Sequence, residues 1–441
     1  MYTKLALRNV KRSIFDYLLY ITTMTILIAV MYVSNGIAVF GNMQAGFQTA
    51  SLPLLIGIIM VVLVNYINTF MMKQRAKEFA NYLLLGMEKS KLSQMLLLEF
   101  CIIGIFCFIL GGLIGAVVNL KFFSNNPPGT KIQLILTFQT ILQTLFFFCI
   151  AEILSAIRMQ RKIYKLQICE LMNENRRNQS LGCNKHKLWG LLFLISLFLF
   201  LVLLCGIAFC PESIAYIIIS FVSMPLICCI FTFYKWLYAY FSFKRITQSE
   251  DLYQGNRLYS SAEITTGTKT SAIMSSIFSI CLLFSILAFV FGMLLFNENF
   301  AIFDTENQQW MGFLQISISI IFGTIYFSIL SLQHIIELKR QSNNFRILYY
   351  IGKSQKQIKS LIKAQVMIKL MIPTMMCFAL LLVGTPFINY KLNMVFPDML
   401  HNFLINAIGE FLFCFIILYF CYFEVVYITS IRYIRLQSKV I

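Results

Sequence analysis

Charged side chains are scarce in this sequence: they make up 12% of its 441 residues, whereas hydrophobic side chains make up 59%. A water-soluble domain of this length could not hide so much apolar surface, so the composition excludes a soluble globular protein. The apolar residues form ten long runs, and each reaches the roughly 20 residues that a membrane-spanning helix needs. The sequence therefore predicts an all-α polytopic membrane protein with about ten transmembrane helices. The runs cover residues 17–39, 52–72, 95–120, 134–157, 188–209, 213–237, 272–296, 311–333, 365–388 and 402–428.

Cationic residues are nearly missing from every second loop between these runs. Of the 36 Lys and Arg, only Lys121, Lys131 and Lys391 belong to these cation-poor loops. All the others lie in the two termini, in the remaining loops or at the membrane ends that border them. This asymmetry is typical of membrane proteins whose basic loops stay inside, so both termini are predicted to be cytoplasmic. The net charge of +18 lies beside predicted spans, where it sets topology and meets anionic lipid. We therefore expect membrane lipid as a partner and no nucleic acid.

Histidine is rare, and the motifs of common catalytic sites are missing. His186, His334 and His401 are scattered along the chain, so the sequence predicts neither a metal site nor a catalytic residue. The segment beginning at Gly352 reads Gly-Lys-Ser, like the end of a phosphate-binding loop. Ile347 occupies the place where that loop requires its first glycine. The chain is therefore not expected to bind or hydrolyse ATP, and any energy must come from a partner.

Two of the basic segments repeat each other. Residues 73–92 follow the second apolar run and residues 339–358 follow the eighth, and each reads as a basic helix extension, an apolar stripe, a glycine break and a basic amphipathic helix. We name these segments the first and second elbow. Convergent composition beside the membrane is the alternative, but the spacing matches without any insertion. At a constant offset of 266, the matched pairs are Lys73 and Lys339, Phe79 and Phe345, Gly86 and Gly352, and Leu92 and Ile358. Two equivalent elbows predict two equivalent contacts, for which a symmetric dimer is the simplest partner.

The phenylalanine–glycine spacing of both elbows resembles the FtsX-like permease domain of ABC transporters. The opening segment, residues 7–13, followed directly by a membrane span, is similar to the start of the bacitracin-efflux (BceB-like) permeases. The resemblance covers the whole chain and implies two FtsX-like four-helix repeats that flank a central helix pair. The implied parts are a cytoplasmic interfacial helix at 1–16, a first four-helix unit at 17–157, the central pair with its linkers at 158–271, a second four-helix unit at 272–428 and a cytoplasmic tail at 429–441.

The resemblance implies a cytoplasmic ABC ATPase dimer, which binds ATP and magnesium and docks on the elbows. It also implies a multi-pass protein of the bacterial cell membrane that takes part in efflux or removal of, or immunity to, an antimicrobial peptide or a lipid-like amphipathic molecule. The residues expected to couple the ATPase are Phe79, Tyr82, Gly86, Lys89, Leu92, Phe345, Tyr349, Gly352, Lys356 and Ile358.

One departure from that family leaves the substrate open. The bacitracin-efflux permeases carry a large extracellular domain between spans seven and eight, and this chain has only residues 297–310 there. A second interpretation is therefore a mechanical or sensory transmitter that is coupled to a membrane histidine kinase or another partner. An intramembrane enzyme is disfavoured because no nucleophile with a base or metal pair is visible.

Acidic residues are especially rare within the spans, and each one is costly there, which makes it a functional candidate. Glu99, Glu152 and Glu424 lie near cytoplasmic ends, where we expect pairing with Lys369 or a loop arginine. Glu410 lies deeper, in the outward half of the last span, and is the best candidate for contact with a substrate or a proton. Separately, the two glycines of Gly111-x3-Gly115 predict a close approach between two helices.

Overall fold

The computed structural model describes residues 14–45, 51–123, 130–165, 186–247, 268–297, 305–395 and 403–438. The predicted interfacial helix at 1–16 lies outside these ranges except for its last three residues, which begin the first described helix. The chain divides into two compact units, Met1–Asn178 and Gln179–Ile441. Each unit is described by itself below.

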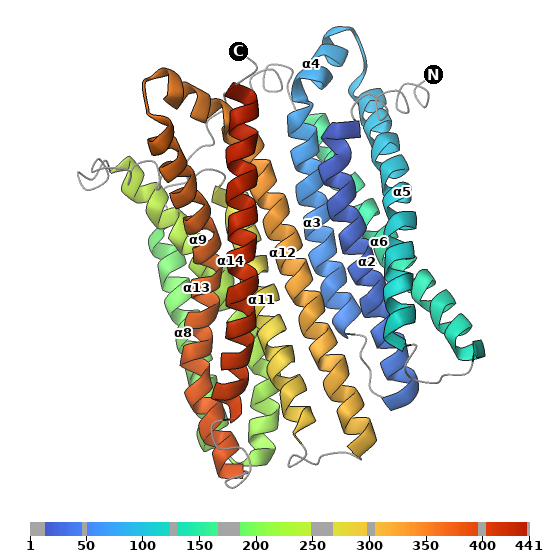
Figure 1. The fold of residues 1–441 in the computed structure, drawn as a ribbon, viewed down its shortest axis with the longest axis vertical. Coiled ribbons are helices and arrows are strands. Elements are labelled where there is room, and N and C mark those ends of the chain that lie inside the picture. The colour runs from blue at the N-terminus through green and yellow to red at the C-terminus, as the bar shows by residue number, and fades with distance from the viewer. Residues whose placement is uncertain are drawn as a thin grey trace. The chain divides into compact units, whose positions relative to one another are not determined.

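All regular structure in the described residues is helical (Figure 1). The first unit contains α2 (Ile14–Ala45), α3 (Ser51–Gln74), α4 (Ala76–Leu84), α5 (Lys89–Phe123) and α6 (Thr130–Lys165). The second unit contains α8 (His186–Phe209), α9 (Glu212–Ile246), α11 (Thr268–Phe296), α12 (Thr305–Tyr350), α13 (Gln355–Val395) and α14 (Phe403–Ser438). The predicted all-α fold is confirmed, and each of the ten apolar runs falls in a helix of its own.

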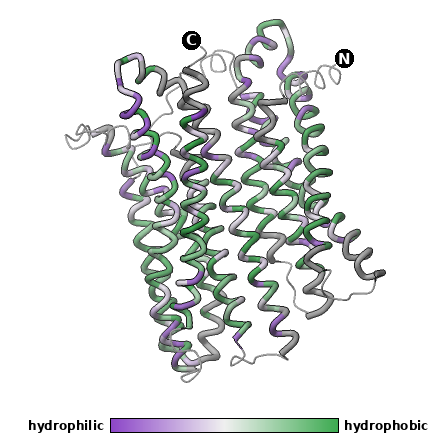
Figure 2. The backbone as a smooth tube through the Cα atoms, viewed as in Figure 1, coloured by the Kyte–Doolittle hydropathy of each residue, from purple (hydrophilic) through white to green (hydrophobic). Residues whose placement is uncertain are grey.

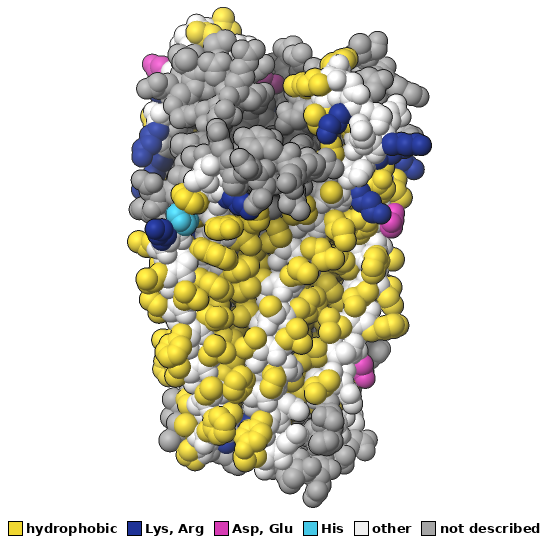
Figure 3. Space-filling view, turned by 90° about the vertical axis from the view of Figure 1, so that its left-hand side faces the viewer, with side chains coloured by type: hydrophobic (Ala, Val, Ile, Leu, Met, Phe, Trp, Pro, Cys, Tyr) yellow, Lys and Arg dark blue, Asp and Glu magenta, His cyan; other side chains and the backbone are white. Residues whose placement is uncertain are grey.

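Most of these helices can cross a membrane. Among the described residues, 9 helices are long and apolar enough to do so, and α3 contains a shorter apolar stretch, Ile56–Thr69. The helices are hydrophobic along their middles, with hydrophilic residues gathered towards the ends (Figure 2). One face of the molecule carries a broad band of hydrophobic side chains, with most of its Lys and Arg above that band (Figure 3). Such a band is the surface that lipid requires.

The first unit is built around α2, whose most extensive contact is with α5. Gly111 and Gly115 of α5 make this contact possible. A Cβ atom at Gly111 would lie 2.8 Å from the carbonyl oxygen of Thr25, and one at Gly115 would lie 2.7 Å from the Cβ of Tyr32. Only glycine lets the two backbones approach this closely, so the predicted role of the glycine pair in helix packing is confirmed.

In the second unit, buried polar bonds attach α9 to its neighbours. The hydroxyl of Tyr234 on α9 lies 2.6 Å from Ser279 Oγ on α11, which in turn donates to the carbonyl oxygen of Pro373 in α13 at 2.9 Å. Near the C-terminal end of α13, Lys391 Nζ donates to the carbonyl oxygen of Cys210 at 2.7 Å, at the α8–α9 turn. The α8–α9 hairpin is thus hydrogen-bonded to α13 at two separated levels.

Candidate functional site

The first elbow turns on Gly86, whose φ is 91°. At the end of α4, the N–H of Met87 donates to the carbonyl oxygen of Tyr82 (3.0 Å), and the N–H of Gly86 donates to that of Leu83 (3.1 Å). These two bonds form a Schellman motif, which satisfies carbonyl groups that the helix end would leave without partners. Glycine fits this position because it adopts a positive φ without steric cost.

The second elbow has the same glycine turn at its tip. Gly352 has a φ of 98°, and the N–H of Lys353 donates to the carbonyl oxygen of Leu348 (3.2 Å). This bond corresponds, at the offset of 266, to the bond from Met87 to Tyr82 in the first elbow. After the turn, the N–H of Ile358 donates to the carbonyl oxygen of Ser354 (3.1 Å), just as Leu92 bonds to Glu88 (3.0 Å). The predicted glycine break is therefore confirmed in both elbows, with matching hydrogen bonds around it.

The repetition extends into the helices that carry the elbows. In the first unit, Asn68 Nδ2 on α3 donates to Ser155 Oγ on α6 at 2.6 Å. In the second unit, His334 Nε2 on α12 shares a hydrogen bond of 2.9 Å with Ser430 Oγ on α14. Asn68 and His334 are again 266 positions apart. In each unit, the membrane helix that leads into the elbow is therefore linked to the unit's last helix through a side chain at a matching position.

Each elbow exposes two apolar side chains at its tip. Leu84 and Leu85 are 60% and 85% exposed, and their counterparts Tyr350 and Ile351 are 62% and 75% exposed. All four lie in the last turn before the glycine, next to charged and polar residues. An exposed apolar pair at the polar end of a membrane protein indicates a surface for another protein. The sequence analysis did not single out these four residues, although the repeat offset places them at matching positions.

Three of the predicted coupling residues are buried instead. Phe79, Leu92 and Ile358 are at most 7% exposed, because the apolar stripe of each elbow faces inwards. Their side chains hold the elbow in place and are not part of its exposed surface, and their role in coupling an ATPase stays a prediction. The side chains of Phe345 and Tyr349 lie outside the described part of the chain.

The remaining predicted elbow residues lie nearer the surface. Gly86, Gly352 and Lys356 are exposed, and Tyr82 is half-buried. Lys89 Nζ donates to the carbonyl oxygen of Tyr164 at 3.2 Å, in the last turn of α6. A cation at this position complements the partial negative charge of a helix C-terminus.

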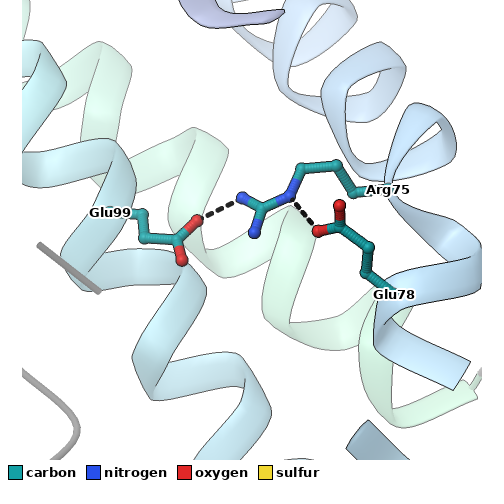
Figure 4. Close-up of polar contacts among 3 residues, drawn as sticks. All are labelled: Arg75, Glu78 and Glu99. Carbon is teal, nitrogen blue, oxygen red and sulfur yellow. Dashed lines mark hydrogen bonds and ion pairs between the residues drawn. The ribbon is translucent and has the colours of Figure 1, made fainter. Parts of the chain in front are cut away.

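A buried ion pair lies under the first elbow (Figure 4). Arg75 is the residue between α3 and α4, and its Nη1 lies 2.5 Å from Glu99 Oε2 on α5. Its Nε lies 2.8 Å from Glu78 Oε2 on α4, and its guanidinium carbon lies 5.4 Å from the centre of the Phe79 ring. Arg75 is 7% exposed and Glu99 is fully buried. Glu99 thus pairs with Arg75, an arginine of the elbow.

This pair holds α4 against α5. A buried charge that loses its partner costs about 3–5 kcal/mol, so neither Arg75 nor Glu99 can be replaced alone without a large penalty. The sequence analysis did not identify Arg75. Its pairing with Glu99 spans 24 positions, and only the packing of α4 on α5 brings the two side chains together.

The second elbow carries amides at all three equivalent positions. At the offset of 266, Arg75, Glu78 and Glu99 correspond to Gln341, Asn344 and Gln365. Gln365 is 6% exposed, so the position on α13 is buried as it is on α5. The backbone differs as well: α3 and α4 are separated at Arg75, whereas α12 runs without a break through Gln341 to Tyr350. The two elbows therefore share a tip and differ at the base.

The other acidic candidates are less deeply buried than Glu99. Glu152 is half-buried on α6 and faces α5, where a Cβ atom on Gly104 would lie 3.5 Å from its Oε1. Glu410 and Glu424 are both exposed on α14. Lys369 is half-buried on α13.

Comparison with known proteins identifies one part of the chain. Residues 50–168 match the family model for the FtsX-like permease C-terminal domain. No curated protein matches the chain at a significant level. The matched residues include α3, α5, α6 and the first elbow with its ion pair. FtsX-like permeases are membrane subunits that normally pair with a cytoplasmic ABC ATPase. The chain therefore contains an FtsX-like permease domain in its first unit, which supports a role as the permease subunit of an ABC transporter.

Proposed function

We propose that this chain is the membrane subunit of an ATP-driven ABC transporter, with one ATPase subunit docked on each elbow. The observation that carries the proposal is the duplicated tip: the same glycine turn presents Leu84 and Leu85 in one unit and Tyr350 and Ile351 in the other. Only the first elbow falls within the family match. The matching hydrogen bonds support extending the assignment to the second.

The apolar tip pairs are suited to insertion into grooves on an ATPase. Burying an exposed Leu, Ile or Tyr side chain is favourable by roughly 1.5–3 kcal/mol, so two such residues at each tip make an adequate anchor. The lysines beside the second tip, Lys353 and Lys356, would provide long-range attraction to an acidic partner surface. ATP and magnesium would be bound by the partner ATPase.

Each elbow continues directly into membrane helices. Movement of the first tip acts on α3 and α5, and movement of the second acts on α12 and α13, because these helices begin or end at the elbows. Closure of an ATPase dimer would thus tilt two pairs of helices at once. Such motion drives the outer part of the membrane bundle mechanically and needs no wide channel.

The proposed cargo is a lipid-like or amphipathic molecule, such as an antimicrobial peptide that acts at the cell envelope. Only residues 297–304 lie between α11 and α12, so no extracellular domain stands there to grip a large soluble substrate. The exposed band of hydrophobic side chains gives an amphipathic molecule access from the side, within the bilayer (Figure 3). The transporter would remove such molecules and confer immunity to them.

A pull-down tests the proposal. The tagged chain is purified from its native membrane beside the double variant Leu85→Glu and Ile351→Glu, and ATP hydrolysis is measured on both eluates. Both side chains are highly exposed, so the substitutions should leave folding unaffected. Gln160→Glu serves as the control, because it also adds a charge at an exposed position, near the C-terminal end of α6.

We expect an ATPase with the parent and the control, and none with the tip variant. Recovery of the parent chain without an ATPase would overturn the proposal. Recovery with a membrane histidine kinase alone would favour the sensory transmitter instead.

A further inference from the structure

We infer that Arg75 is a positioning residue that braces the first elbow against α5, and that the second elbow, whose three matching residues are amides, transmits ATPase movement without this ion pair. This inference rests on the proposed function, since it concerns how a docked ATPase acts on the membrane helices. It makes the two halves of the chain mechanically different although their tips are alike.

The turn itself is a weak connection for force. A Cβ atom placed on Gly86 would meet no atom within 4 Å, so no neighbouring side chain packs against Gly86 where its own side chain would lie. Glycine is also the residue with the greatest backbone freedom. A push on the tip would therefore bend the turn before it displaced α5, unless a second connection joined α4 to α5.

Arg75 provides that second connection. It lies at the opposite end of α4 from Gly86, and its side chain contacts α4 through Glu78 and α5 through Glu99. Glu99 lies ten positions beyond the start of α5, about 15 Å along the helix axis at 1.5 Å per residue. The turn and the ion pair thus hold α4 to α5 at two well-separated points, and a helix fixed at two points cannot pivot.

The base of the elbow is bent but not broken. Arg75 has φ −97° and ψ 13°, outside the helical values of its neighbours. Helix-type hydrogen bonds nevertheless continue across it, from Arg75 N to Met71 O at 3.2 Å and from Phe79 N to Arg75 O at 3.1 Å. The bend directs α4 towards α5, which brings Arg75 to Glu99.

The second elbow has neither the charges nor the bend. Its equivalent residues are Gln341, Asn344 and Gln365, and α12 passes straight through the position of the bend. Amides hydrogen-bond with about half the strength of charge-assisted pairs. We therefore expect the second tip to move mainly with α12, whereas the first tip moves α3, α4 and α5 together.

The experiment transplants the second elbow's residues into the first. The triple variant Arg75→Gln, Glu78→Asn and Glu99→Gln is co-purified with its ATPase and reconstituted in lipid nanodiscs. The variant removes all three charges together, so none of the three is left buried without its partner. The same three amides already stand at the matching positions of the second elbow. The matched control is Gln341→Ala, Asn344→Ala and Gln365→Ala. Three readouts are compared: the ATPase bound per chain, the ATP hydrolysis of the complex relative to the ATPase alone, and the thermal unfolding midpoint.

We expect the amide variant to bind the ATPase as the parent does, because its tip is unchanged. Its stimulation of ATP hydrolysis should drop by about tenfold, within the range of typical coupling between sites. The second-elbow control should stimulate like the parent. Full stimulation by the amide variant, or an equal loss in both variants, would overturn the inference.

A further variant covers the case in which the amide variant fails to fold. Arg75→Lys keeps the positive charge next to Glu99, but a lysine cannot present the guanidinium's separate donors to two carboxylates. Partial stimulation with this folded variant supports the brace, and full stimulation overturns it. If the parent chain recovers no ATPase at all, the proposed function itself fails, which is distinct from every outcome above.

Discussion

Gly86 and Gly352, 266 positions apart, adopt the same left-handed backbone conformation, with φ values of 91° and 98°. Each follows a helix that ends with two exposed apolar residues, and each precedes a helix that returns to the membrane. Three of the hydrogen bonds around Gly86, donated by the N–H groups of Leu85, Met87 and Leu92, have a counterpart 266 positions further along, so the relationship is one of structure as well as of spacing.

Gly86→Ala and Gly352→Ala should each lower the free energy of unfolding by about 1–2 kcal/mol, because an L-residue in the left-handed region is strained. The cost comes from the backbone alone, since a Cβ atom would meet nothing within 4 Å at either position. Gly112→Ala is the matched control: its surroundings are equally open, but it lies within α5, where alanine is the better helix former. Thermal unfolding followed with a thiol-reactive dye checks this, since Cys107 and Cys281 are buried in the folded chain. An equal effect at all three glycines would contradict the assigned role of the turn.

Gly111→Ala should destabilise the first unit by about 1–3 kcal/mol through overpacking. The added Cβ would lie 2.8 Å from both the carbonyl oxygen of Thr25 and the Cβ of Ile28, and a backbone atom of α2 cannot move aside cheaply. The neighbouring residue, Gly112, again provides the comparison, because its Cβ would enter open space. The same dye assay applies, and a Gly111→Ala melting temperature equal to that of Gly112→Ala would show that α2 and α5 do not pack as described.

Tyr234→Phe and Ser279→Ala should each cost about 1 kcal/mol, the net contribution of a typical buried hydrogen bond. The two hydroxyls lie 2.6 Å apart in the chain of bonds that ends at the Pro373 carbonyl oxygen. Because they share one network, the double variant should cost less than the sum of the single variants. Strict additivity in a double-mutant cycle of unfolding free energies would argue against the bond between α9 and α11.

Glu410→Gln should leave the unfolding midpoint unchanged, since Glu410 is exposed on α14 and has no ion-pair partner among the described residues. Any loss of transport or of peptide resistance in this variant would then report on function and not on folding. Resistance equal to that of the parent, at equal expression, would end the candidacy of Glu410 as a substrate or proton contact. Glu424→Gln, on the same exposed helix, is the natural comparison.

The sequence was sufficient to predict the helices and the repeat, because both depend on local patterns. Apolar runs of about 20 residues predict spans directly, and a glycine at the same offset in two basic segments predicts two turns. It was not sufficient to predict which face of an elbow is buried. Phe79 and Leu85 are both apolar, yet one is buried and the other exposed, and only the packing of α4 on α5 decides between them. The Arg75–Glu99 pair could not be predicted either, because Glu99 lies outside the repeated segment and only the packing of α4 on α5 brings it to Arg75.

The amides at the second elbow have a consequence for any partner that is itself symmetrical. Two identical ATPase subunits docked on this chain would meet one braced and one unbraced elbow, so their nucleotide sites would work against different mechanical loads. The order of the two halves within a single chain makes that difference permanent, since neither elbow can take the other's place. In a homodimeric ATPase, one subunit would therefore always act on the elbow with the Arg75–Glu99 ion pair, and the other would always act on the elbow with amides.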